Sequence, residues 1–443
     1  MKPYSERINM PQPINIFWFR RDLRLDDNVG LFHALQGKHP VLPVFIFDTN
    51  ILEQLPEDDA RVTFIFETLQ SLKQTLQTKH NSNIALFYGK PIEVFKQLIE
   101  TYTIETVYTN HDYEPYAINR DQKIKQFLTS QNVDFKTYKD QVIFERIDIV
   151  KSDGTPYMVY TPYMKQWKIK FRSSPFKTYN TASLLNNTFK IAYLPNISLA
   201  DMGFKPSKQT VKDYEITPSL IQNYEATRNF PDKDATSRLG PHLRFGTVSI
   251  RDMVKKAVIE QNEIFLQELI WREFFMQILW HFPHTATQSF KPPYDRIEWR
   301  NNEQEFKLWC DGKTGYPLVD AGMRQLNETG FMHNRVRMLV GSFLCKHLLI
   351  DWRWGEAYFA EKLHDFELAS NVGNWQWVAG CGVDAAPYFR IFNPTTQIEK
   401  FDKNLDYIKQ WVPEFQELTY PLPIVEHTFA RERCLKVYKN ALI

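Results

Sequence analysis

The sequence predicts an α/β, Rossmann-like N-terminal domain with a parallel, doubly wound sheet, followed by an all-helical C-terminal domain. Two observations carry this prediction. Apolar runs alternate with helical patterns over residues 14–145, and helical periodicity dominates residues 221–443. The 443 residues suffice for two or three domains. Residues 146–220, between the two parts, are predicted to form an interdomain linker.

Four short apolar runs in the N-terminal part have the composition of buried strands. Each contains Val, Ile, Phe or Tyr, and segments with apolar residues at helical spacing lie between them. Such alternation is typical of parallel strands joined by crossover helices. The predicted strands are 14–20, 41–47, 84–88 and 106–110, and the predicted helices are 59–77, 91–102 and 116–128.

The loop after the first predicted strand lacks the glycines of a dinucleotide-binding sheet. A nucleotide site on such a sheet usually carries GxGxxG at this position. Here residues 19–28 read FRRDLRLDDN, without a glycine. The N-terminal domain is therefore predicted to be Rossmann-like in architecture but not to bind a dinucleotide in the usual way.

The rest of the chain changes character twice. Residues 173–220 are rich in Ser, Thr, Asn and Pro and have little periodicity, which is typical of a linker that runs over a surface. Beyond residue 220 the apolar residues recur at helical spacing, most clearly in 263–280 and 331–350.

Composition limits the possible classes of function. The chain is 43% hydrophobic and 24% charged, as a globular protein is. Nine of its eleven tryptophans lie beyond residue 270, so aromatic side chains are concentrated in the helical part. The net charge of +2 neither requires nor excludes a nucleic acid, so any site for a polyanion must come from local arrangement.

The cysteines and the N-terminal segment favour a cytoplasmic protein. Cys310, Cys345, Cys381 and Cys434 show neither CxxC nor zinc-site spacing, so we expect free thiols and no metal site. The opening MKPYSERINMPQP has no apolar stretch of the kind a signal peptide needs, and no apolar run is long enough to span a bilayer.

Residues 236–249, TSRLGPHLRFGTVS, place hydroxyl groups and an arginine at the start of a segment. Thr236, Ser237 and Arg238 suit an anion, because exposed backbone amides at a helix N-terminus and a guanidinium both attract negative charge. The same hydroxyls suit an ordinary helix N-cap. This stretch taken alone favours the N-cap.

Helical spacing places Glu268, Trp271 and Arg272 on one face, at positions i, i+3 and i+4. A carboxylate, a flat apolar ring and a guanidinium together suit a nucleobase, through hydrogen bonding, stacking and phosphate contact. The alternative is a Glu–Arg pair on a solvated face beside a core tryptophan, and the stretch alone favours that alternative.

A second helical face is formed by Asn334, Arg337 and Met338, again at positions i, i+3 and i+4. The amide suits a ring edge, the guanidinium suits a carboxylate or an anion, and the thioether suits an aromatic plane. An ordinary helix interface with a buried ion pair would have the same pattern.

The stretch ELASNVGNWQW at 367–377 holds two tryptophans at positions i and i+2. Asn371 and Trp375 share a helix face, whereas Trp377 points about 200° away from Trp375, because each residue advances about 100°. With Asp365 and Glu367 just before them, these residues indicate two neighbouring compartments lined from several helices.

Seven motifs, taken together, match a known family. They are WFRRDLRLDDN (18–28), TSRL (236–239), ELIWREF (268–274), TGYPLVDAGMRQLNETGFMHNRVRM (314–338), DWRWGE (351–356), NWQW (374–377) and DAAPYFRIFNPTTQ (384–397). From about residue 14 to about 435, the chain closely resembles the photolyase/cryptochrome family, and specifically the bacterial class I cyclobutane-pyrimidine-dimer photolyases. The resemblance implies an α/β antenna domain, a long linker, and a helical domain that binds FAD and DNA. In that domain the FAD lies beneath a pocket for a dimer turned out of the DNA, and photolyases are an established example of such base flipping.

The resemblance also implies which residues hold the flavin. The segment 236–240 would contact its phosphates, Arg337 and Asp365 would pair beside the ring system, and Asn371 would face N5. Phe265 stands where several relatives have tryptophan, and Glu367 stands where the family usually has aspartate. The full implied set is Tyr224, Thr236, Ser237, Arg238, Leu239, Gly240, Phe265, Arg337, Asp365, Glu367 and Asn371.

On the substrate side, the resemblance implies that Glu268 hydrogen-bonds the dimer and that Trp271 and Trp377 form flat walls. Arginines would contact DNA phosphates. The implied DNA- and substrate-binding set is Arg228, Glu268, Trp271, Arg272, Asn334, Arg335, Met338, Trp377 and Arg390.

The implied catalytic residues are Glu268, Asn371 and three tryptophans, Trp375, Trp352 and Trp299. The tryptophans would form a relay that reduces photoexcited flavin from the surface, because indole is among the easiest side chains to oxidise.

The implied activity is light-driven repair of cyclobutane pyrimidine dimers, a carbon–carbon lyase reaction that requires no metal. Excited, fully reduced FAD would give an electron to the dimer, the ring would open, and the electron would return. The main alternative is a cryptochrome, a blue-light receptor without repair activity. The presence of Glu268, Trp271, Trp377 and Asn371 argues against it. A (6-4) photolyase would carry histidines in the pocket where this chain has Asn334 and Met338.

The resemblance leaves the second, antenna chromophore open. Folate-binding relatives carry a glutamate at the position that aligns with Ala117, and EPY followed by RD within 110–121 is closer to deazaflavin-binding relatives. A deazaflavin, another flavin or no antenna is therefore expected rather than folate. The expected partner is UV-damaged DNA, single- or double-stranded, bound by a cytoplasmic monomer that has no membrane contact.

Overall fold

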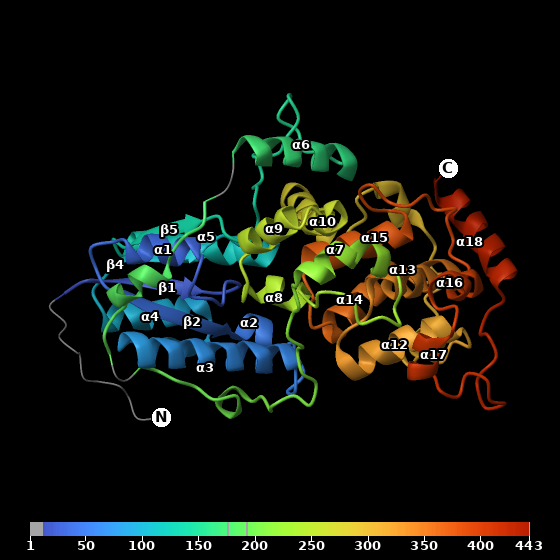
Figure 1. Ribbon diagram of the computed structural model, residues 1–443, viewed down its shortest axis with the longest axis horizontal. Coiled ribbons are helices and arrows are strands. Elements are labelled where there is room, and N and C mark those ends of the chain that lie inside the picture. The colour runs from blue at the N-terminus through green and yellow to red at the C-terminus, as the bar shows by residue number, and fades with distance from the viewer. Residues whose placement is uncertain (1–11, 175–176, 192–193, 443) are drawn as a thin grey trace. The chain divides into compact units, whose positions relative to one another are not determined.

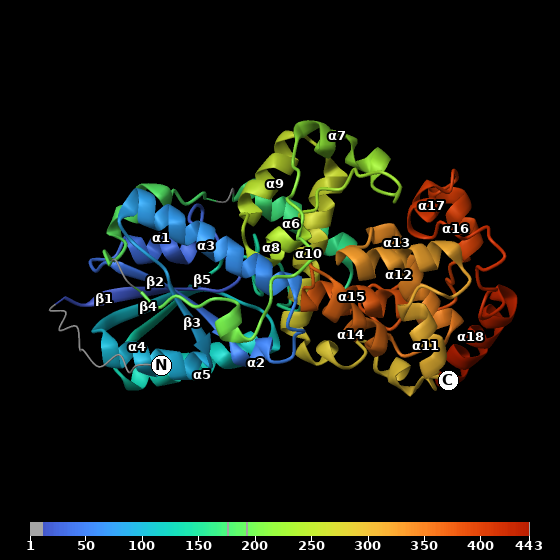
Figure 2. The ribbon, with the colours of Figure 1, turned by 90° about the horizontal axis from the view of Figure 1, so that it is seen from below.

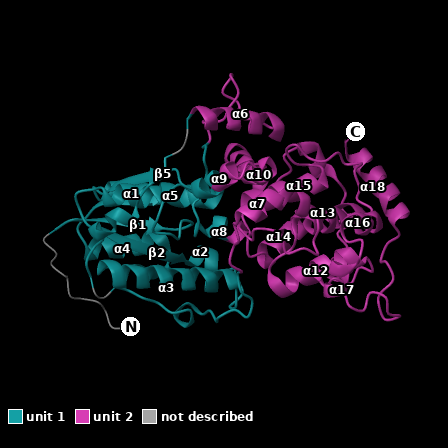
Figure 3. Cartoon of the chain, in the orientation of Figure 1, with its two compact units in different colours: residues 1–145, 174–211, 242–255 teal, residues 146–173, 212–241, 256–443 magenta. Residues whose placement is uncertain are grey.

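The structure is a computed structural model that describes residues 12–174, 177–191 and 194–442 (Figure 1). The chain divides into two compact units, which Figure 3 colours separately. Unit 1 is Met1–Glu145, Ser174–Val211 and His242–Lys255, and unit 2 is Arg146–Ser173, Lys212–Pro241 and Lys256–Ile443. The segment expected as a linker, 146–220, is thus shared between the units, and 242–255 from the expected helical domain lies in unit 1.

Unit 1 is built on a parallel sheet of five strands in the order β3-β2-β1-β4-β5. This doubly wound order confirms the predicted fold class. The four predicted strands are present, and the sheet adds β5, whose sequence DFKTY is largely exposed and lacks an apolar run. The strands are β1 Ile14–Phe19, β2 Val41–Asp48, β3 Ala85–Gly89, β4 Ile104–Asn110 and β5 Asp134–Tyr138.

Helices cover both faces of this sheet, with α1 and α3 on one side and α4 and α5 on the other (Figure 2). Strand β1 is buried along its whole length because its side chains alternate between the two layers. Phe17 and Phe19 pack in the core of the α1/α3 side, and Ile16 and Trp18 pack in the core of the α4/α5 side. The helices are α1 Val29–Leu35, α2 Thr49–Leu52, α3 Ala60–His80, α4 Pro91–Thr101 and α5 Pro115–Ser130.

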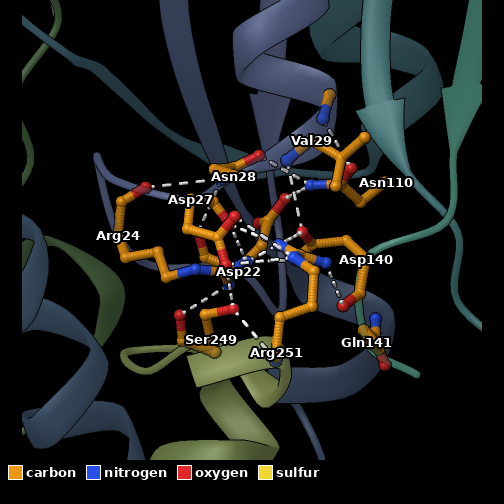
Figure 4. Close-up of polar contacts among 12 residues, drawn as sticks. Asp22, Arg24, Asp27, Asn28, Val29, Asn110, Asp140, Gln141, Ser249 and Arg251 are labelled. Atoms are coloured by element: carbon orange, nitrogen blue, oxygen red, sulfur yellow. Dashed lines mark hydrogen bonds and ion pairs between the residues drawn. The ribbon is translucent and has the colours of Figure 1, made fainter. Parts of the chain in front are cut away.

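The glycine-free loop after β1 forms a buried polar network within unit 1 (Figure 4). The carboxylate of Asp140 accepts from Arg24 at 2.7 Å and from Arg251 at 2.8 Å. Arg251 also pairs with Asp27 at 3.0 Å, and Asn110 donates to Asp22 at 2.6 Å. Because Arg251 lies in 242–255, these ion pairs explain why that segment belongs to unit 1 and not to the helical unit.

Asp140 is the centre of this network, with a side chain only 1% exposed. Burial alone would raise the pKa of Asp140, but the charges of Arg24 and Arg251 outweigh it and lower that pKa below its ordinary value. Asp140→Asn is therefore expected to destabilise unit 1 by about 3 kcal/mol at pH 7, because it leaves two buried guanidinium groups undercompensated. Faster amide hydrogen exchange in β1 and β4 would report this loss.

The ion pairs of Asp140 with Arg24 and Arg251 make this loss of stability depend on pH. Since the folded-state pKa of Asp140 is lowered, its contribution is present above the ordinary aspartate pKa of about 3.9 and is lost as pH falls below it. The difference between wild type and Asp140→Asn should therefore shrink on acidification. Asp134→Asn is the matched control, because the side chain of Asp134 is 70% exposed and its pair with Lys136 should contribute less than about 1 kcal/mol.

Unit 2 is helical, and two of its helices lie where the sequence predicted helical segments. Residues 263–280 form α10, whereas 331–350 begin a helix only at Asn334, where the His333 side chain accepts from the Arg335 N–H. Its helices are α6 Tyr160–Ser173, α7 Pro218–Thr227, α10 Glu263–His281, α11 Glu303–Cys310, α12 Pro317–Thr329, α13 Asn334–Ser342, α14 Trp352–Lys362, α15 Leu368–Ala379, α16 Pro394–Phe401, α17 Asp406–Trp411 and α18 His427–Leu442.

Shorter elements complete the chain. Helices α8 Gly240–Phe245 and α9 Ile250–Ile259 each cross a boundary between the units. A π-helical turn, Phe343–His347, follows α13, and 3-10 turns lie at Ala182–Asn187, Ala200–Met202, Pro283–Ala286 and Pro292–Arg296.

Part of the segment expected as a linker is an anchored helix of unit 2. Helix α6 packs on α10 through Tyr160, Tyr163 and Trp167, which are buried. The buried carboxylate of Glu273 on α10 accepts from the Tyr163 hydroxyl at 3.1 Å and from the Trp167 indole at 2.7 Å. These bonds fix α6 to the helical core.

Two further findings concern the described residues only. None of their helices has the length and apolar character needed to cross a membrane. No three of their His, Cys, Asp and Glu side chains are grouped so that they could hold a metal ion. Residues 1–11, on which the expectation of no signal peptide rests, lie outside the described part.

Candidate active site

A cavity of about 390 Å³ lies inside unit 2, in the size range of small-molecule sites. Thirteen of the residues singled out in the sequence line it, so the tertiary fold brings together side chains that are far apart in the chain. They are Arg228, Gly240, Glu268, Trp271, Arg272, Asn334, Arg337, Met338, Asp365, Glu367, Asn371, Trp375 and Trp377. Lining residues that the sequence did not single out are Phe275, Gly341, Phe359, Leu363, Phe366, Ser370, Asn374 and Val378.

Ten expected site residues are not among those that line this cavity. Trp299 and Trp352 belong to the core beside it, and Phe265 is buried on α10 against Tyr224 at 5.2 Å between ring centroids. The ten are Tyr224, Thr236, Ser237, Arg238, Leu239, Phe265, Arg335, Arg390, Trp299 and Trp352.

One end of the cavity holds a bidentate ion pair. Arg337 donates from its two terminal nitrogens to the carboxylate of Asp365 at 3.1 and 2.9 Å, and its Nε donates to the Met332 carbonyl at 2.7 Å. Gly240 lies directly against this pair. A Cβ added to Gly240 would stand 2.7 Å from the Asp365 side chain, so only glycine allows this close approach.

Asn371 faces the cavity with one end of its amide already occupied. Its Nδ2 donates to the backbone carbonyl of Glu356 at 3.0 Å and to the Glu356 carboxylate at 2.9 Å. A backbone carbonyl only accepts, so the nitrogen must be the atom on that side. Oδ1 is then the amide atom available to a ligand.

Glu356 is the residue behind Asn371 that the sequence reasoning did not assign. Burial raises the pKa of Glu356, and the hydrogen bond from Asn371 only partly opposes that shift. Glu356 lies on α14 and Asn371 on α15, so spacing within one helix cannot pair them. The available signal was the motif DWRWGE, of which Glu356 is the last residue.

Two more ion pairs flank the cavity. Arg228 donates to Glu268 at 2.6 Å, with side chains 22% and 35% exposed, so Glu268 is accessible from the cavity mouth. Arg272 donates to Glu367 at 2.9 Å, and there the side chains are only 12% and 5% exposed. Arg272, expected to face DNA, thus contacts Glu367, which was expected to face the flavin.

The three tryptophans expected to form a relay lie in or against one buried cluster of unit 2. Trp375 packs between neighbouring helices, and a Cβ added to Gly355 on α14 would stand 2.1 Å from the Trp375 ring. Trp352, the first residue of that helix, belongs to the same buried cluster, and Trp299 packs at its margin. The rings nearest to Trp375 are Phe359 at 4.9 Å and Trp309 at 6.2 Å.

Positive charge gathers around the start of α13. Burial lowers the pKa of His333 to about 4, assisted by the charges of four arginines, Arg337, Arg238, Arg335 and Arg228. Burial and the neighbouring charges of Arg228 and Arg390 also lower the pKa of Arg335. Positive charges that repel one another in one region favour the binding of an anionic ligand there.

The segment expected to hold phosphates adopts a bent conformation. Arg238 has a φ of 54°, pairs with Asp234 at 2.8 Å and stacks over the Phe331 ring at 3.7 Å. Helix α8 begins only at Gly240, so Thr236 and Ser237 precede it and do not cap it. These hydroxyls therefore do not form the ordinary N-cap that the stretch taken alone favoured.

The residues around the cavity fit a flavin. A planar, polar ring system needs flat apolar walls, an acceptor for a ring N–H and a charged group beside the ring edge. Trp375 and Phe359 supply apolar surface, Asn371 supplies the acceptor, and the Arg337–Asp365 pair supplies the charge.

Comparison with known proteins agrees with this geometry. Residues 15–181 match the family described as DNA photolyase, and residues 265–419 match the family described as the FAD binding domain of DNA photolyase. The deoxyribodipyrimidine photo-lyase of Agrobacterium fabrum is 37% identical to this chain, in an alignment that covers 96% of this chain and 97% of that protein.

Solved structures give the same result. A bacterial class III photolyase from Agrobacterium tumefaciens has 34% identity and a TM-score of 0.87, covering 99% of each chain. The photolyase of Sulfolobus tokodaii, whose crystal structure contains two FAD molecules, has 33% identity and a TM-score of 0.78 over 96% of this chain and 99% of its own. This chain belongs to the photolyase/cryptochrome family.

Proposed function

We propose that this chain is a light-driven deoxyribodipyrimidine photo-lyase that opens cyclobutane pyrimidine dimers in DNA. One observation carries the proposal: a single cavity is lined both by the residues expected around a flavin and by those expected around a dimer. Glu268, Trp271 and Trp377 form the second group, and their presence favours repair over light sensing alone. The relatives named deoxyribodipyrimidine photo-lyase at 34–37% identity support it.

FAD is the cofactor, and Arg337, Asp365 and Asn371 are the residues that would hold its ring system. When bound, it supplies light absorption and the electron that opens the dimer. Asn371 presents an uncharged acceptor, because its nitrogen is held by Glu356. A neutral amide oxygen can accept a hydrogen bond from a protonated ring nitrogen. Unlike a carboxylate, it does not oppose added negative charge on the ring.

On the substrate side, Glu268 would hydrogen-bond the base edges of the dimer. Arg228 holds one carboxylate oxygen of Glu268 at 2.6 Å, which orients the carboxylate and leaves its second oxygen for the bases. Trp271 and Trp377 would stack on the flat faces of the bases. These two tryptophans line the same cavity from different helices, Trp271 from α10 and Trp377 from α15.

DNA affinity would come from the arginines around α13. Arg390 is exposed on the loop after α15, and the guanidinium carbon of Arg335 lies 4.4 Å from the centre of the Phe401 ring. Phosphate binding by such groups is salt dependent and insensitive to sequence. We propose single- and double-stranded damaged DNA as substrates and a cytoplasmic monomer as the working form.

A second chromophore in unit 1 is proposed to be a deazaflavin or another flavin. Two facts support this over folate. Ala117 stands at the position where folate-binding relatives carry glutamate and is buried in α5, and the Sulfolobus relative contains a second FAD. Extraction of bound pigments followed by mass spectrometry would identify the group, and recovery of a folate would overturn this assignment.

The test of the proposed function uses the flavin-loaded protein, reduced anaerobically, with an oligonucleotide containing one thymine dimer. Blue light should convert the dimer to two thymines with many turnovers, and the dark sample should not. A matched oligonucleotide with a (6-4) lesion should be unchanged. Absence of dimer repair under these conditions would favour a cryptochrome, and repair of the (6-4) lesion would move the chain to that class of photolyase.

A further inference from the structure

Trp271 is covered on one side by a second aromatic ring that does not line the cavity. The rings of Tyr160 and Trp271 are nearly parallel, at 7°, with centroids only 3.6 Å apart. Tyr160 is 5% exposed, whereas Trp271 lines the cavity. The indole therefore has Tyr160 stacked on it from the interior and is also exposed to the ligand space.

Tyr160 is held from two directions, so its ring is a fixed support. Its hydroxyl donates to the Gln267 carbonyl at 2.9 Å, one helical turn before Trp271 on α10. Its backbone N–H donates to the carboxylate of Asp384 at 3.0 Å, in the loop after α15, the helix that carries Trp377. Burial, with the nearby charge of Glu268, raises the pKa of Tyr160, so the phenol keeps its proton and the bond to Gln267.

We propose that Tyr160 is a positioning residue that fixes the plane of Trp271 and, through Asp384, its setting relative to Trp377. This inference rests on the proposed function, because it concerns how the walls of the dimer pocket are held in place. An indole packed on one face only by aliphatic groups can rotate about its side-chain bonds, whereas an aromatic ring stacked parallel to it restricts its plane. A slot with two fixed walls selects a rigid, fused pair of bases over a single base that is free to move.

The attachment of α6 does not depend on Tyr160. Tyr163 and Trp167 both donate to the buried Glu273, one and two turns further along the helix. Replacing Tyr160 should therefore leave α6 in place. Tyr163→Phe gives the matched control, because it removes a buried hydroxyl from the same helix without touching the stack on Trp271.

The experiment compares Tyr160→Leu, Tyr160→Phe and Tyr163→Phe, each loaded with FAD. Dissociation constants are measured in the dark for a dimer-containing oligonucleotide and for its undamaged twin. Tyr160→Leu should weaken dimer binding about tenfold, the upper end of what an aromatic pair contributes. Its affinity for undamaged DNA should be unchanged, because that affinity comes from the arginines. Tyr160→Phe, which keeps the stack, should restore dimer binding to within about twofold of wild type, as should Tyr163→Phe.

The outcomes separate the inference from the function. If wild type prefers the dimer and Tyr160→Leu prefers it equally, the positioning role is wrong while the proposed function stands. If Tyr160→Phe is as weak as Tyr160→Leu, the hydroxyl and not the stacked ring is responsible, and the inference is wrong. If wild type itself shows no preference for the dimer, the proposed function fails, and the inference fails with it.

Discussion

Replacing Trp375 with phenylalanine is expected to abolish light-driven reduction of the bound FAD. Phenylalanine fills most of the same space but is far harder to oxidise than indole, so the relay would lose its first member. The ring is 3% exposed and packs closely against Gly355, so the smaller ring should also cost about 1–3 kcal/mol of stability. Absorption changes of the oxidised flavin under blue light with an external reductant would report the loss.

Trp309→Phe is the matched control for this prediction. Trp309 is fully buried in the same core, its ring centroid is 6.2 Å from that of Trp375, and its indole N–H donates to the Val340 carbonyl at 3.1 Å. Its replacement disturbs the same core, but Trp352 and Trp299 are left intact. Flavin reduction should therefore survive. Equal loss in both variants would show that the proposed path through Trp352 is not the working one.

Repair by flavin that has been reduced chemically beforehand separates the relay from the repair site. Trp375→Phe should then open dimers at close to the wild-type rate, because the electron for the dimer no longer has to arrive through the tryptophans. A variant that fails in both assays would point to a disturbed flavin site and not to a broken relay.

The sheet of unit 1 could be predicted because its strands are buried on both faces. Runs such as 14–19 and 41–47 are almost entirely apolar for this reason, and such a run is visible in a sequence. Strand β5 has no such run, since it lies at the edge of the sheet. Helix α1 is only seven residues long, Val29–Leu35, so it offers too few turns for a period to be read.

Helix α6 shows a different kind of failure. Its buried residues Tyr160, Tyr163 and Trp167 recur at helical spacing, and that signal was present in the sequence. The expectation of a linker over 146–220 rested on the composition of 173–220, and it extended to a stretch whose own pattern is helical. The Ser/Thr/Asn/Pro-rich part, within 173–220, contains irregular segments between its 3-10 turns at Ala182–Asn187 and Ala200–Met202.

The candidate site could be predicted where its residues share one helix. Asn334, Arg337 and Met338 were placed together by spacing alone, and all three line the cavity. Contacts between helices could not be found in that way. Glu356 behind Asn371 and Tyr160 behind Trp271 come from other helices, so only the tertiary fold brings them together.

The Arg337–Asp365 pair gives the second large expected effect: Asp365→Asn should leave the purified protein with little or no bound FAD. The pair is bidentate, with side chains 24% and 20% exposed, so it is partly shielded from water. Loss of the carboxylate leaves Arg337 without its charged partner beside the ring system, and the guanidinium is then held only by the bond from its Nε to the Met332 carbonyl. A cost of at least about 1.4 kcal/mol, tenfold in affinity, follows from a single charge-assisted bond.

The measurement is the FAD content per protein and the dissociation constant for added FAD. Asp311→Asn provides the matched control, because its pair with Lys307 is an exposed i, i+4 pair at 3.2 Å that should contribute almost nothing. It should bind FAD as wild type does. If Asp365→Asn also retained FAD with wild-type affinity, the pair would serve the fold and not the cofactor. The cofactor would then be held mainly through its phosphates, by Tyr224 and the residues of 236–240, which lie largely outside the cavity lining.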